Sequence, residues 1–336
     1  MRVCCEFGDA DKGDPSSKSV ASMKVLLIGE QAAGIRTLQS LAQGTAQIVA
    51  VMASPATQDA ASLWNSAATS GYATWPAAWA RDPNFAAQVR DAGVDLILNV
   101  HSMVVIRKEV LEAPRLGSFN LHPGPLPRYA GLNSVSWAIY QGEKEYGVTL
   151  HKLGTKIDAG PIVYQEAVGI DDEETGLTLT AKCVRVGVPL VMRLLAAAAQ
   201  GPTNIPLVPQ DLSKRQYFGR EVPASGRLSW NRPAQRIGRF VRASDFFPFP
   251  SPWGAPRTTL GDLTLGIAKV RLTGRRADVS PGTVGARTDG GLEVACADEW
   301  LLVRQVFAGG RCIPAKQVLK TGDRFADCLA KEVTTP

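Results

Sequence analysis

The sequence lacks the features that mark membrane, metal-binding and disulfide-rich proteins. In its 336 residues the apolar stretch "LVMRLLAAAA" (190–199) is interrupted by Arg193, and it falls short of the roughly 18–20 residues that a membrane-spanning helix needs. The six cysteines are spread out, with only Cys4 and Cys5 adjacent, and they form no Cys-x-x-Cys pair. We therefore expect a soluble protein of the reducing cytoplasm that binds no metal and has no set of disulfides.

Signals for dinucleotide binding and for secretion are missing as well. The turn after the first apolar run reads "IGEQAAGIR" (28–36), and its Gly29 and Gly34 fit neither GxGxxG nor GxxxxGK[ST], which argues against an NAD or ATP site. Residues 1–22 have little apolar content and no hydrophobic segment of a secretory signal. We predict that they form a disordered extension ahead of Met23.

Charge is distributed unevenly along the chain. Residues 1–211 contain 17 Lys and Arg against 20 Asp and Glu, a net charge of −3, whereas residues 212–336 contain 20 against 11, a net charge of +9. Such an imbalance is usually a solvated surface. It also leaves open an anionic partner for the second half, either nucleic acid, a nucleotide or a carrier-bound substrate.

Apolar runs typical of buried strands alternate with helix-like segments in the first half of the chain. This alternation predicts βαβ units and therefore a doubly wound, mostly parallel α/β sheet with helices on both faces. The expected strands lie at 24–29, 46–53 and 94–100, and helical patterns lie near 35–44 and 85–93.

The second half reads as a smaller β domain. Short strand patterns at 263–272, 281–287, 291–298 and 300–307 predict a small OB-like β-barrel. We therefore expect a catalytic domain, a linker, a C-terminal domain and a short tail, at residues 23–205, 206–222, 223–325 and 326–336.

Three polar residues beside turns have the chemistry of an acyl-transfer site. In "GSFNLH" (117–122) the two-residue period of a strand places Asn120 and His122 on one face, and the proline-rich "PGPLPRYAG" that follows predicts a rigid loop. Asp158 precedes Ala-Gly at a later turn. An amide stabilises an oxyanion, an imidazole moves protons near pH 7, and a carboxylate orients it. Taken singly, each residue could be structural.

The ordered pattern resembles the 10-formyltetrahydrofolate-dependent formyltransferases. Their signature of N-x-H, a proline-rich loop, a helix ending near "GE", a "GVTLH"-like strand and D-x-G is similar to Asn120-Leu-His122, "GPLPRYAG" (124–131), "GEKEYGVTLH" (142–151) and "DAG" (158–160). The resemblance implies a Rossmann-like fold and 10-formyltetrahydrofolate as co-substrate. It implies that His122 transfers protons, that Asn120 stabilises the oxyanion and that Asp158 holds His122 and favours its charged form.

The resemblance also implies binding residues. The main chain of "NVHSMV" (99–104) would line the pterin pocket. The implied cofactor-binding residues are Val100, His101, Ser102, Met103 and Leu126, and the implied substrate-binding residues are Asn133, Tyr129 and Trp64. The chain departs from the family at Gly124 and Ala130, where members often have Ser and Arg. His101 either lines the pocket or is structural, and we expect His151, at a strand end, to be structural or to support the site.

The acceptor is predicted from a segment without positive charge. Members that formylate methionyl-tRNA carry a Lys/Arg-rich insertion after the second strand, whereas residues 53–77 of this chain contain no Lys or Arg. This favours a small or carrier-tethered amine, an amino sugar or an amino-acid-type substrate of specialised metabolism, and makes tRNA an unexpected partner. A methionyl-tRNA formyltransferase and a non-catalytic folate- or nucleotide-binding relative remain the alternatives, and the oligomeric state stays open.

Overall fold

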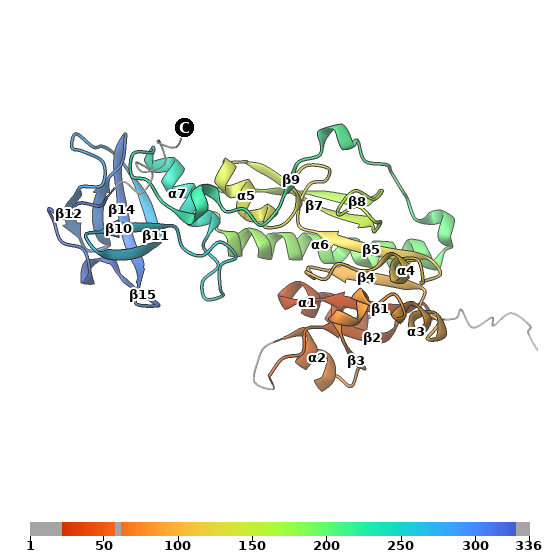
Figure 1. The fold of residues 1–336 in the computed structure, drawn as a ribbon. Coiled ribbons are helices and arrows are strands. Elements are labelled where there is room, and N and C mark those ends of the chain that lie inside the picture. Colours follow the sequence, from red (N-terminus) through yellow and green to blue (C-terminus); the bar gives the residue numbers. More distant parts are fainter. Residues whose placement is uncertain (1–21, 58–61, 327–336) are drawn as a thin grey trace, which may run out of the picture.

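The chain folds into two domains that lie side by side (Figure 1). The computed structural model describes residues 22–57 and 62–326. The predicted extension 1–22 and tail 326–336 therefore fall outside the described residues except for Ser22 and Ala326. We call the N-terminal part the α/β domain and the part that begins near residue 223 the C-terminal domain.

A seven-stranded sheet forms the centre of the α/β domain. The strands are β1 (Lys24–Gly29), β2 (Gln47–Ala53), β3 (Thr74–Pro76), β4 (Leu96–Val100), β5 (Gly117–His122), β7 (Glu145–Lys152) and β8 (Ile162–Gly169). Their order is β3-β2-β1-β4-β5-β7-β8; the pairs from β3 to β5 are parallel, and β7 and β8 are antiparallel additions. The predicted mostly parallel sheet is confirmed.

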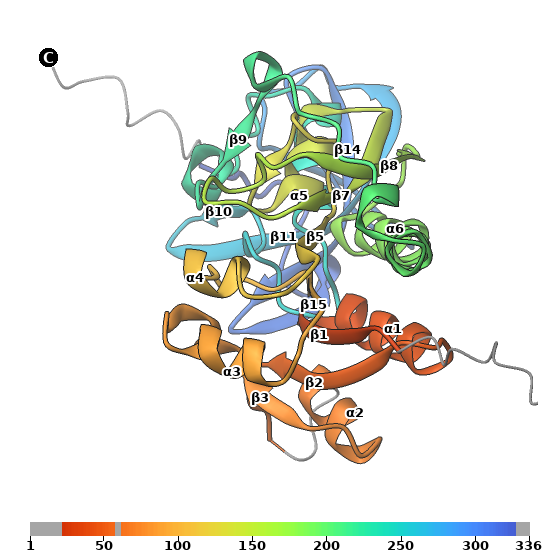
Figure 2. The same cartoon turned by 90° about the vertical axis from the view of Figure 1, so that its right-hand side faces the viewer.

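Helices cover both faces of this sheet. They are α1 (Gln31–Ala42), α2 (Leu63–Thr69), α3 (Phe85–Asp91), α4 (Lys108–Leu111) and α6 (Gly176–Ala199), with short 3-10 helices at Ala77–Arg81, Pro202–Asn204 and Leu212–Lys214. One apolar core unites α1, α2 and α6 with the sheet, and another unites it with α3 and α4 (Figure 2). Because both faces are buried, strands such as β1 are apolar on both sides after their first residue, Lys24. The doubly wound arrangement is confirmed.

The sheet topology determines where ligands can approach. The strand order reverses between β1 and β4, and in open α/β sheets such a reversal opens a crevice at the carboxyl ends of the strands. Asn99 lies near this end of β4, and Asn120 and His122 lie at the same end of the neighbouring β5. The predicted site residues therefore start at the place where this fold offers a crevice.

The C-terminal domain has its own antiparallel sheet and core. It consists of α7 (Ala234–Ala243), β10 (Arg257–Leu260), β11 (Leu263–Arg276), β12 (Val284–Thr288), β13 (Gly291–Ala295), β14 (Glu299–Ala308), β15 (Arg311–Pro314) and 3-10 helices at Pro223–Gly226 and Ala315–Gln317. Its buried side chains include Ile237, Val241, Ile267 and Val303. The antiparallel sheet is confirmed, and its OB-like character stays a prediction.

An aromatic cluster joins the two domains. Helix α5 (Ser134–Gln141) packs against α7, and rings from both sides meet: Trp137, Tyr140, Phe218, Phe240 and Trp253, with centroids 4.9 Å apart for Trp137 and Phe218. The short strand β6 (Ala130–Gly131) pairs with β9 (Tyr217–Phe218). The segment 206–222, predicted to be a linker, thus lies against the proline-rich loop. No helix in the described ranges meets the length and hydrophobicity of a membrane span.

Candidate functional site

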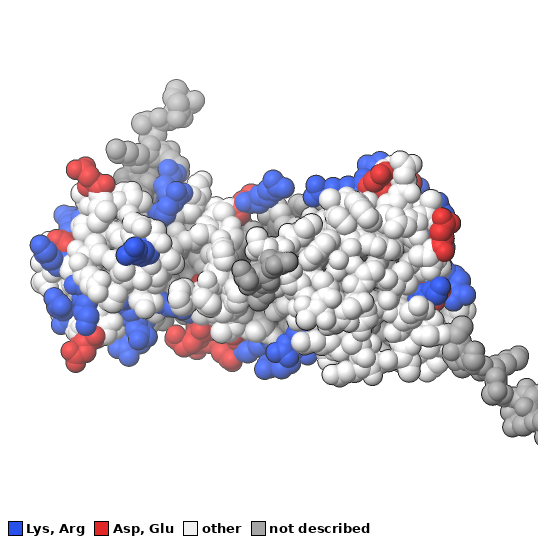
Figure 3. Space-filling view, turned by 90° about the horizontal axis from the view of Figure 1, so that it is seen from below, with Lys and Arg blue, Asp and Glu red and all other residues white. Residues whose placement is uncertain are grey.

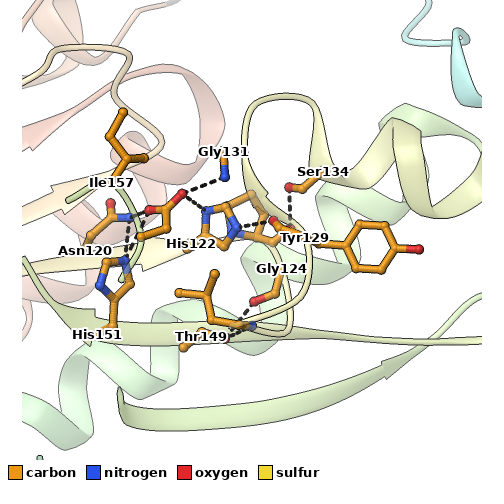
Figure 4. Close-up of polar contacts among 12 residues, drawn as sticks. Asn120, His122, Gly124, Tyr129, Gly131, Ser134, Thr149, His151 and Ile157 are labelled. Atoms are coloured by element: carbon orange, nitrogen blue, oxygen red, sulfur yellow. Dashed lines mark hydrogen bonds and ion pairs between the residues drawn. The ribbon is translucent and has the colours of Figure 1, made fainter. Parts of the chain in front are cut away.

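Three of the residues predicted from the sequence lie together at the carboxyl end of β5. Nδ1 of His122 is 3.5 Å from Oδ2 of Asp158, and Nδ2 of Asn120 is 3.4 Å from Oδ1 of the same carboxylate. All three side chains are buried, with 4, 7 and 8% of the His122, Asp158 and Asn120 surfaces exposed. Figure 4 shows the side chains of Asn120, His122 and His151 close together. The structure brings these residues into one polar cluster.

Main-chain contacts fix the protonation pattern of His122. Its Nε2 lies 2.8 Å from the carbonyl oxygen of Tyr129. A carbonyl only accepts hydrogen bonds, so Nε2 carries the hydrogen, and the free lone pair of the neutral ring is on Nδ1, facing Asp158. Burial lowers the pKa of His122; the nearby Asp158 charge and the Tyr129 carbonyl oppose this shift, and His151 adds to it. The ring is therefore neutral at pH 7.

Asp158 is held as a carboxylate although it is buried. Burial alone would raise its pKa, but His122, His151 and the backbone N–H of Gly131 together lower it. That N–H donates to Oδ2 over 2.8 Å. The cluster thus places a permanent negative charge beside a neutral imidazole, and a proton arriving on Nδ1 would be stabilised by that charge.

Two further residues complete the cluster. Nε2 of His151 lies 3.1 Å from Nδ2 of Asn120 and 3.4 Å from Oδ1 of Asp158, and Nδ2 of Asn99 donates to Oδ1 of Asn120 over 2.9 Å. Asn120 pairs with His151 in the antiparallel β5–β7 ladder and with Asn99 in the parallel β4–β5 ladder. His151 thus lies in a supporting place, as predicted, whereas no sequence pattern points to the Asn99 side chain; both contacts follow from the registers of the two ladders.

The glycine at the first departure from the family pattern has a steric reason. A Cβ on Gly124 would lie 2.7 Å from Nε2 of His122 and 2.9 Å from the carbonyl oxygen of Tyr129, so a side chain there would displace the imidazole from its carbonyl partner. Gly160 is equally tight, because a Cβ would lie 1.9 Å from the carbonyl oxygen of Lys152. Both glycines are required by close packing around the cluster.

Strained backbone is concentrated here. His101, Tyr129, Asn133 and Asp158 all have positive φ angles, of 52°, 56°, 54° and 51°. Non-glycine residues rarely adopt this left-handed conformation, which costs of order 1–3 kcal/mol each and is found most often at functional sites. Gln31, Ala224 and Ser225 adopt the same conformation elsewhere, but Tyr129 and Asp158 contact His122 directly, which favours a functional interpretation of the strain at these two residues.

The predicted cofactor-binding residues from Val100 to Met103 become more exposed as the chain leaves the end of β4. Val100 is fully buried, His101 is partly buried, and Met103 is 69% exposed. Burial, with the nearby His122 charge second, lowers the pKa of His101 to about 4. Oγ of Ser102 accepts from the N–H of Val104. The segment therefore runs from the core to a surface that exposes apolar atoms.

The predicted substrate-binding residues are less close to the cluster. The Tyr129 hydroxyl oxygen lies 2.6 Å from Oε1 of Gln141 and 2.7 Å from Oε1 of Glu143, and in Figure 4 its ring points away from His122; its carbonyl contacts His122. Asn133 precedes α5 without capping it, and Trp64 on α2 packs against the core. Leu126, assigned to the cofactor, is buried and donates its N–H to Thr149.

The predicted linker forms part of the site. Nε2 of Gln210 donates to the carbonyls of Asp158 and Gly160 over 3.1 and 2.6 Å, and Arg215 donates to the carbonyl of Ile157 over 2.9 Å. The N–H of Ala130 donates to the carbonyl of Gln216 over 2.8 Å. Residues 206–222 therefore hold both the Asp158 turn and the proline-rich loop, and they had been expected only to connect the domains.

Charge on the surface differs between the domains. In Figure 3 the face of the α/β domain turned to the viewer is mostly uncharged, whereas blue Lys and Arg side chains are spread over the C-terminal domain. The described residues contain no group of three or more His, Cys, Asp or Glu side chains arranged to hold a metal ion.

Comparison with known proteins assigns both domains to one family. The family model described as formyl transferase matches residues 23–195, and the model of the formyl transferase C-terminal domain matches residues 222–322.

Solved structures with the same fold are similar over most of the chain. HypX from Aquifex aeolicus is 18% identical, with a TM-score of 0.65 over 89% of this chain, which spans only 49% of HypX. WlaRD, a sugar 3N-formyl transferase solved with dTDP and 5-N-formyl-THF, is 17% identical with a TM-score of 0.62, covering 85% of this chain and 97% of WlaRD. The N-formyltransferase of Helicobacter canadensis, solved with folinic acid and dTDP-3-aminofucose, is 17% identical with a TM-score of 0.61, covering 85% and 98%.

Proposed function

Because this chain belongs to the formyl transferase family of enzymes, we propose that it moves a formyl group from 10-formyltetrahydrofolate to the primary amine of a small or carrier-tethered substrate. The observation that carries the proposal is the buried cluster of Asn120, His122 and Asp158 at the carboxyl ends of the parallel strands. A protein that only bound folate would have no need for a neutral base beside a buried carboxylate, with an amide donor next to both.

The donor set fits a formyl carrier. 10-Formyltetrahydrofolate supplies a formyl group on a nitrogen that can leave when it is protonated. The partly buried to exposed segment 101–105, with Met103 and Val105 exposed, offers apolar surface for its ring next to the cluster, since the preceding Val100 lies on the strand adjacent to β5. WlaRD and the Helicobacter canadensis enzyme, solved with 5-N-formyl-THF and folinic acid, support a folate in this fold.

The residues of the cluster take distinct roles. As the amine nitrogen bonds to the formyl carbon, the formyl oxygen gains negative charge. Asn120 would stabilise this charge with the N–H that makes only a long 3.4 Å contact with Asp158, while its other N–H stays on His151. Nδ1 of His122 would take the proton that the amine loses and return it to the folate nitrogen as that carbon–nitrogen bond breaks. Asp158 would stabilise the imidazolium between these steps. The transfer of the formyl group and of one proton in these steps requires neither a metal ion nor an oxidant or reductant.

We assign the acceptor to the amino-sugar class, with a carrier-tethered amino-acid amine as the second member of the proposal. The absence of Lys and Arg from residues 53–77 supports a small acceptor, because recognition of nucleic-acid phosphates requires cations. WlaRD is described as a sugar 3N-formyl transferase, and the N-formyltransferase of Helicobacter canadensis was solved with dTDP-3-aminofucose. The basic C-terminal domain is the observation that favours tRNA instead.

The test is a panel of acceptors. The full chain is incubated with 10-formyltetrahydrofolate and, in separate reactions, dTDP-linked amino sugars, a carrier-bound aminoacyl thioester, methionyl-tRNA or no amine. Release of tetrahydrofolate and mass spectrometry of the acceptor are both followed. We expect formylated amino sugar and no turnover with methionyl-tRNA. Folate binding without turnover on any amine would contradict the proposal and favour a binding protein, and efficient formylation of tRNA would overturn the choice of acceptor.

A further inference from the structure

We propose that Asn99 is a positioning residue that holds the Asn120 amide in its reactive orientation; this inference rests on the proposed function. Asn99 contributes Nδ2 to a 2.9 Å hydrogen bond with Oδ1 of Asn120, and the two residues are direct partners across β4 and β5. Both side chains are buried, with 7 and 8% of their surfaces exposed. Asn99 would act on the substrate only through Asn120.

The direction of each hydrogen bond follows from one main-chain carbonyl. Nδ1 of His151 lies 3.0 Å from the carbonyl oxygen of Lys152, so it carries the hydrogen and leaves Nε2 bare in the neutral ring. Bare Nε2 requires a donor, and Nδ2 of Asn120 lies 3.1 Å away. Nδ2 of Asn120 also lies 3.4 Å from Oδ1 of Asp158, a carboxylate oxygen that can only accept a hydrogen bond. Asn120 therefore turns its oxygen toward Asn99, whose NH₂ satisfies it.

The result is a one-way relay from Asn99 through Asn120 and His151 to the backbone. Without the Asn99 donor, the oxygen of Asn120 would be a buried acceptor with no partner, and the amide could rotate by 180° to regain one. Rotation would turn the Asn120 oxygen, rather than its NH₂, toward His151 and Asp158. An amide in that orientation cannot donate to a formyl oxygen on the same side.

Stability alone does not explain an amide at this position. Asn99 neighbours Ile28 in the β1–β4 ladder, and its side of the sheet is covered by the apolar cluster that includes Ile97 and Val110. Its own Oδ1 has no hydrogen-bond partner in the described part of the chain. A buried unpaired oxygen is unfavourable, so an apolar side chain would suit this core better. The amide is therefore explained by what it does to Asn120.

Two substitutions of nearly the same shape separate positioning from packing. Asn99→Leu removes the donor, and the single-turnover rate is expected to fall roughly 10- to 100-fold, less than the roughly 10²–10³-fold of losing an oxyanion donor. Asn99→Asp puts a carboxylate against the Asn120 oxygen at high pH, but its protonated form donates again. Its rate relative to wild type should therefore rise as pH falls from 8 to 6, by at most about tenfold per pH unit. The titratable groups that face this position, His101, His122, His151 and Asp158, are present in every variant. Dividing each rate by wild type at the same pH removes the part of the pH response that the substitution leaves unchanged.

Controls distinguish this idea from a general loss of structure. Ser118→Ala, two residues before Asn120 on β5, removes a buried hydrogen bond to the carbonyl of Leu111 without touching the relay, and should leave the rate within about twofold. Adding Asn99→Leu to Asn120→Ala should cost little more than Asn120→Ala alone, because both act through one amide. Folate binding should be unchanged in all of them.

The deciding measurement pairs the rates with an NMR readout that needs no turnover. In protein labelled with ¹⁵N-asparagine, the side-chain amide hydrogens of Asn120 should exchange slowly in wild type and faster in Asn99→Leu. Normal rates and unchanged exchange in Asn99→Leu, or a rate of Asn99→Asp that does not respond to pH, would overturn the relay. If wild type transfers formyl to no amine, the proposed function fails, and the exchange data alone decide whether Asn99 holds Asn120.

Discussion

Buried carboxylates in the C-terminal domain have different partners from the buried carboxylate Asp158 in the α/β domain. In the C-terminal domain Asp245 and Glu293, 9 and 6% exposed, form ion pairs with Lys269 and Arg275. In the α/β domain Asp158, equally buried at 7%, lies beside two histidines and beside no Lys or Arg recorded as an ion-pair partner in the described ranges. A lysine or arginine neutralises a carboxylate at all physiological pH values, whereas an imidazole does so only when it binds a proton.

The same contrast separates Asp158 from other carboxylates of its own domain. Asp95 and Glu174, 7 and 5% exposed, pair with Arg115 and Lys182. The first pair joins residues that precede β4 and β5, and the second lies at the start of α6. A structural role is sufficient to explain both pairs. Asp158 instead lies beside the rings of His122 and His151, and it has a positive φ angle itself. We therefore interpret Asp158, the buried carboxylate that lies beside histidines, as functional, and Asp95 and Glu174 as structural.

The largest expected effect comes from removing the proton carrier. His122→Ala should lower the single-turnover rate by roughly 10²–10⁴-fold, the range typical of lost general acid–base catalysis. Binding of 10-formyltetrahydrofolate should persist, because the predicted folate surface lies around residues 99–104. Rapid-quench kinetics with isothermal calorimetry on the same preparation measure both quantities. If folded His122→Ala transferred the formyl group at a nearly normal rate, there would be no reason to assign Asp158 a function that the carboxylates paired with Lys or Arg lack.

A smaller effect concerns acid stability. The pKa values of His122 and His101 are lowered in the folded state, the latter from 6.5 to about 4. The folded chain therefore binds fewer protons than the unfolded chain, so stability is full above pH 6.5 and decreases as pH falls through the lowered values. For His101 the loss is at most about 3 kcal/mol below pH 4. Denaturant unfolding between pH 7 and 4 should show a shallower decrease for His101→Asn than for wild type; identical slopes would contradict the burial of this ring.

The smallest expected effect concerns a buried carboxylate of the C-terminal domain that is paired with an arginine. Arg275→Ala leaves the buried Glu293 without its ion-pair partner and should lower the free energy of unfolding by about 1–2 kcal/mol, because Arg275 itself is 58% exposed and its charge is partly screened. Arg276→Ala is the matched control, since its ion pair with Asp278 is exposed at both ends. Neither should change the rate with a small amine by more than about twofold. A large loss of rate in Arg275→Ala would place the C-terminal domain in the chemistry.

The strands and turns of the α/β domain were largely predictable because their signals are local. The run "KVLLIG" predicted β1 with its observed bounds, Lys24–Gly29, and the family motif with a helix ending near "GE" agrees with the place of α5. The apolar stretch at 190–199 was only the last part of α6, which continues through Pro189 because packing along its whole length outweighs one missing hydrogen bond. Propensity within a short window does not contain that information.

The site was predictable where residues are near in sequence and not where they meet across strands. Asn120 and His122 share a strand face, so their two-residue spacing identified them. Asn99 and His151 reach Asn120 only through the registers of two ladders, one parallel and one antiparallel. The contact between Gln210 and the Asp158 turn needs the chain to return over 50 residues. Such neighbours depend on the assembled fold and have no local signature.

The most direct test of the central claim is a double-mutant cycle on His122 and Asp158 by single-turnover formyl transfer. Asp158→Asn keeps the shape, removes the charge, and should lower the pKa of His122 further and cut the rate by roughly 10²–10⁴-fold. Because both residues would serve one proton transfer, combining Asp158→Asn with His122→Ala should cost little more than the worse single change. If Asp158→Asn kept nearly normal chemistry, or if the two losses simply multiplied, the proposed pairing of His122 with Asp158 would be wrong.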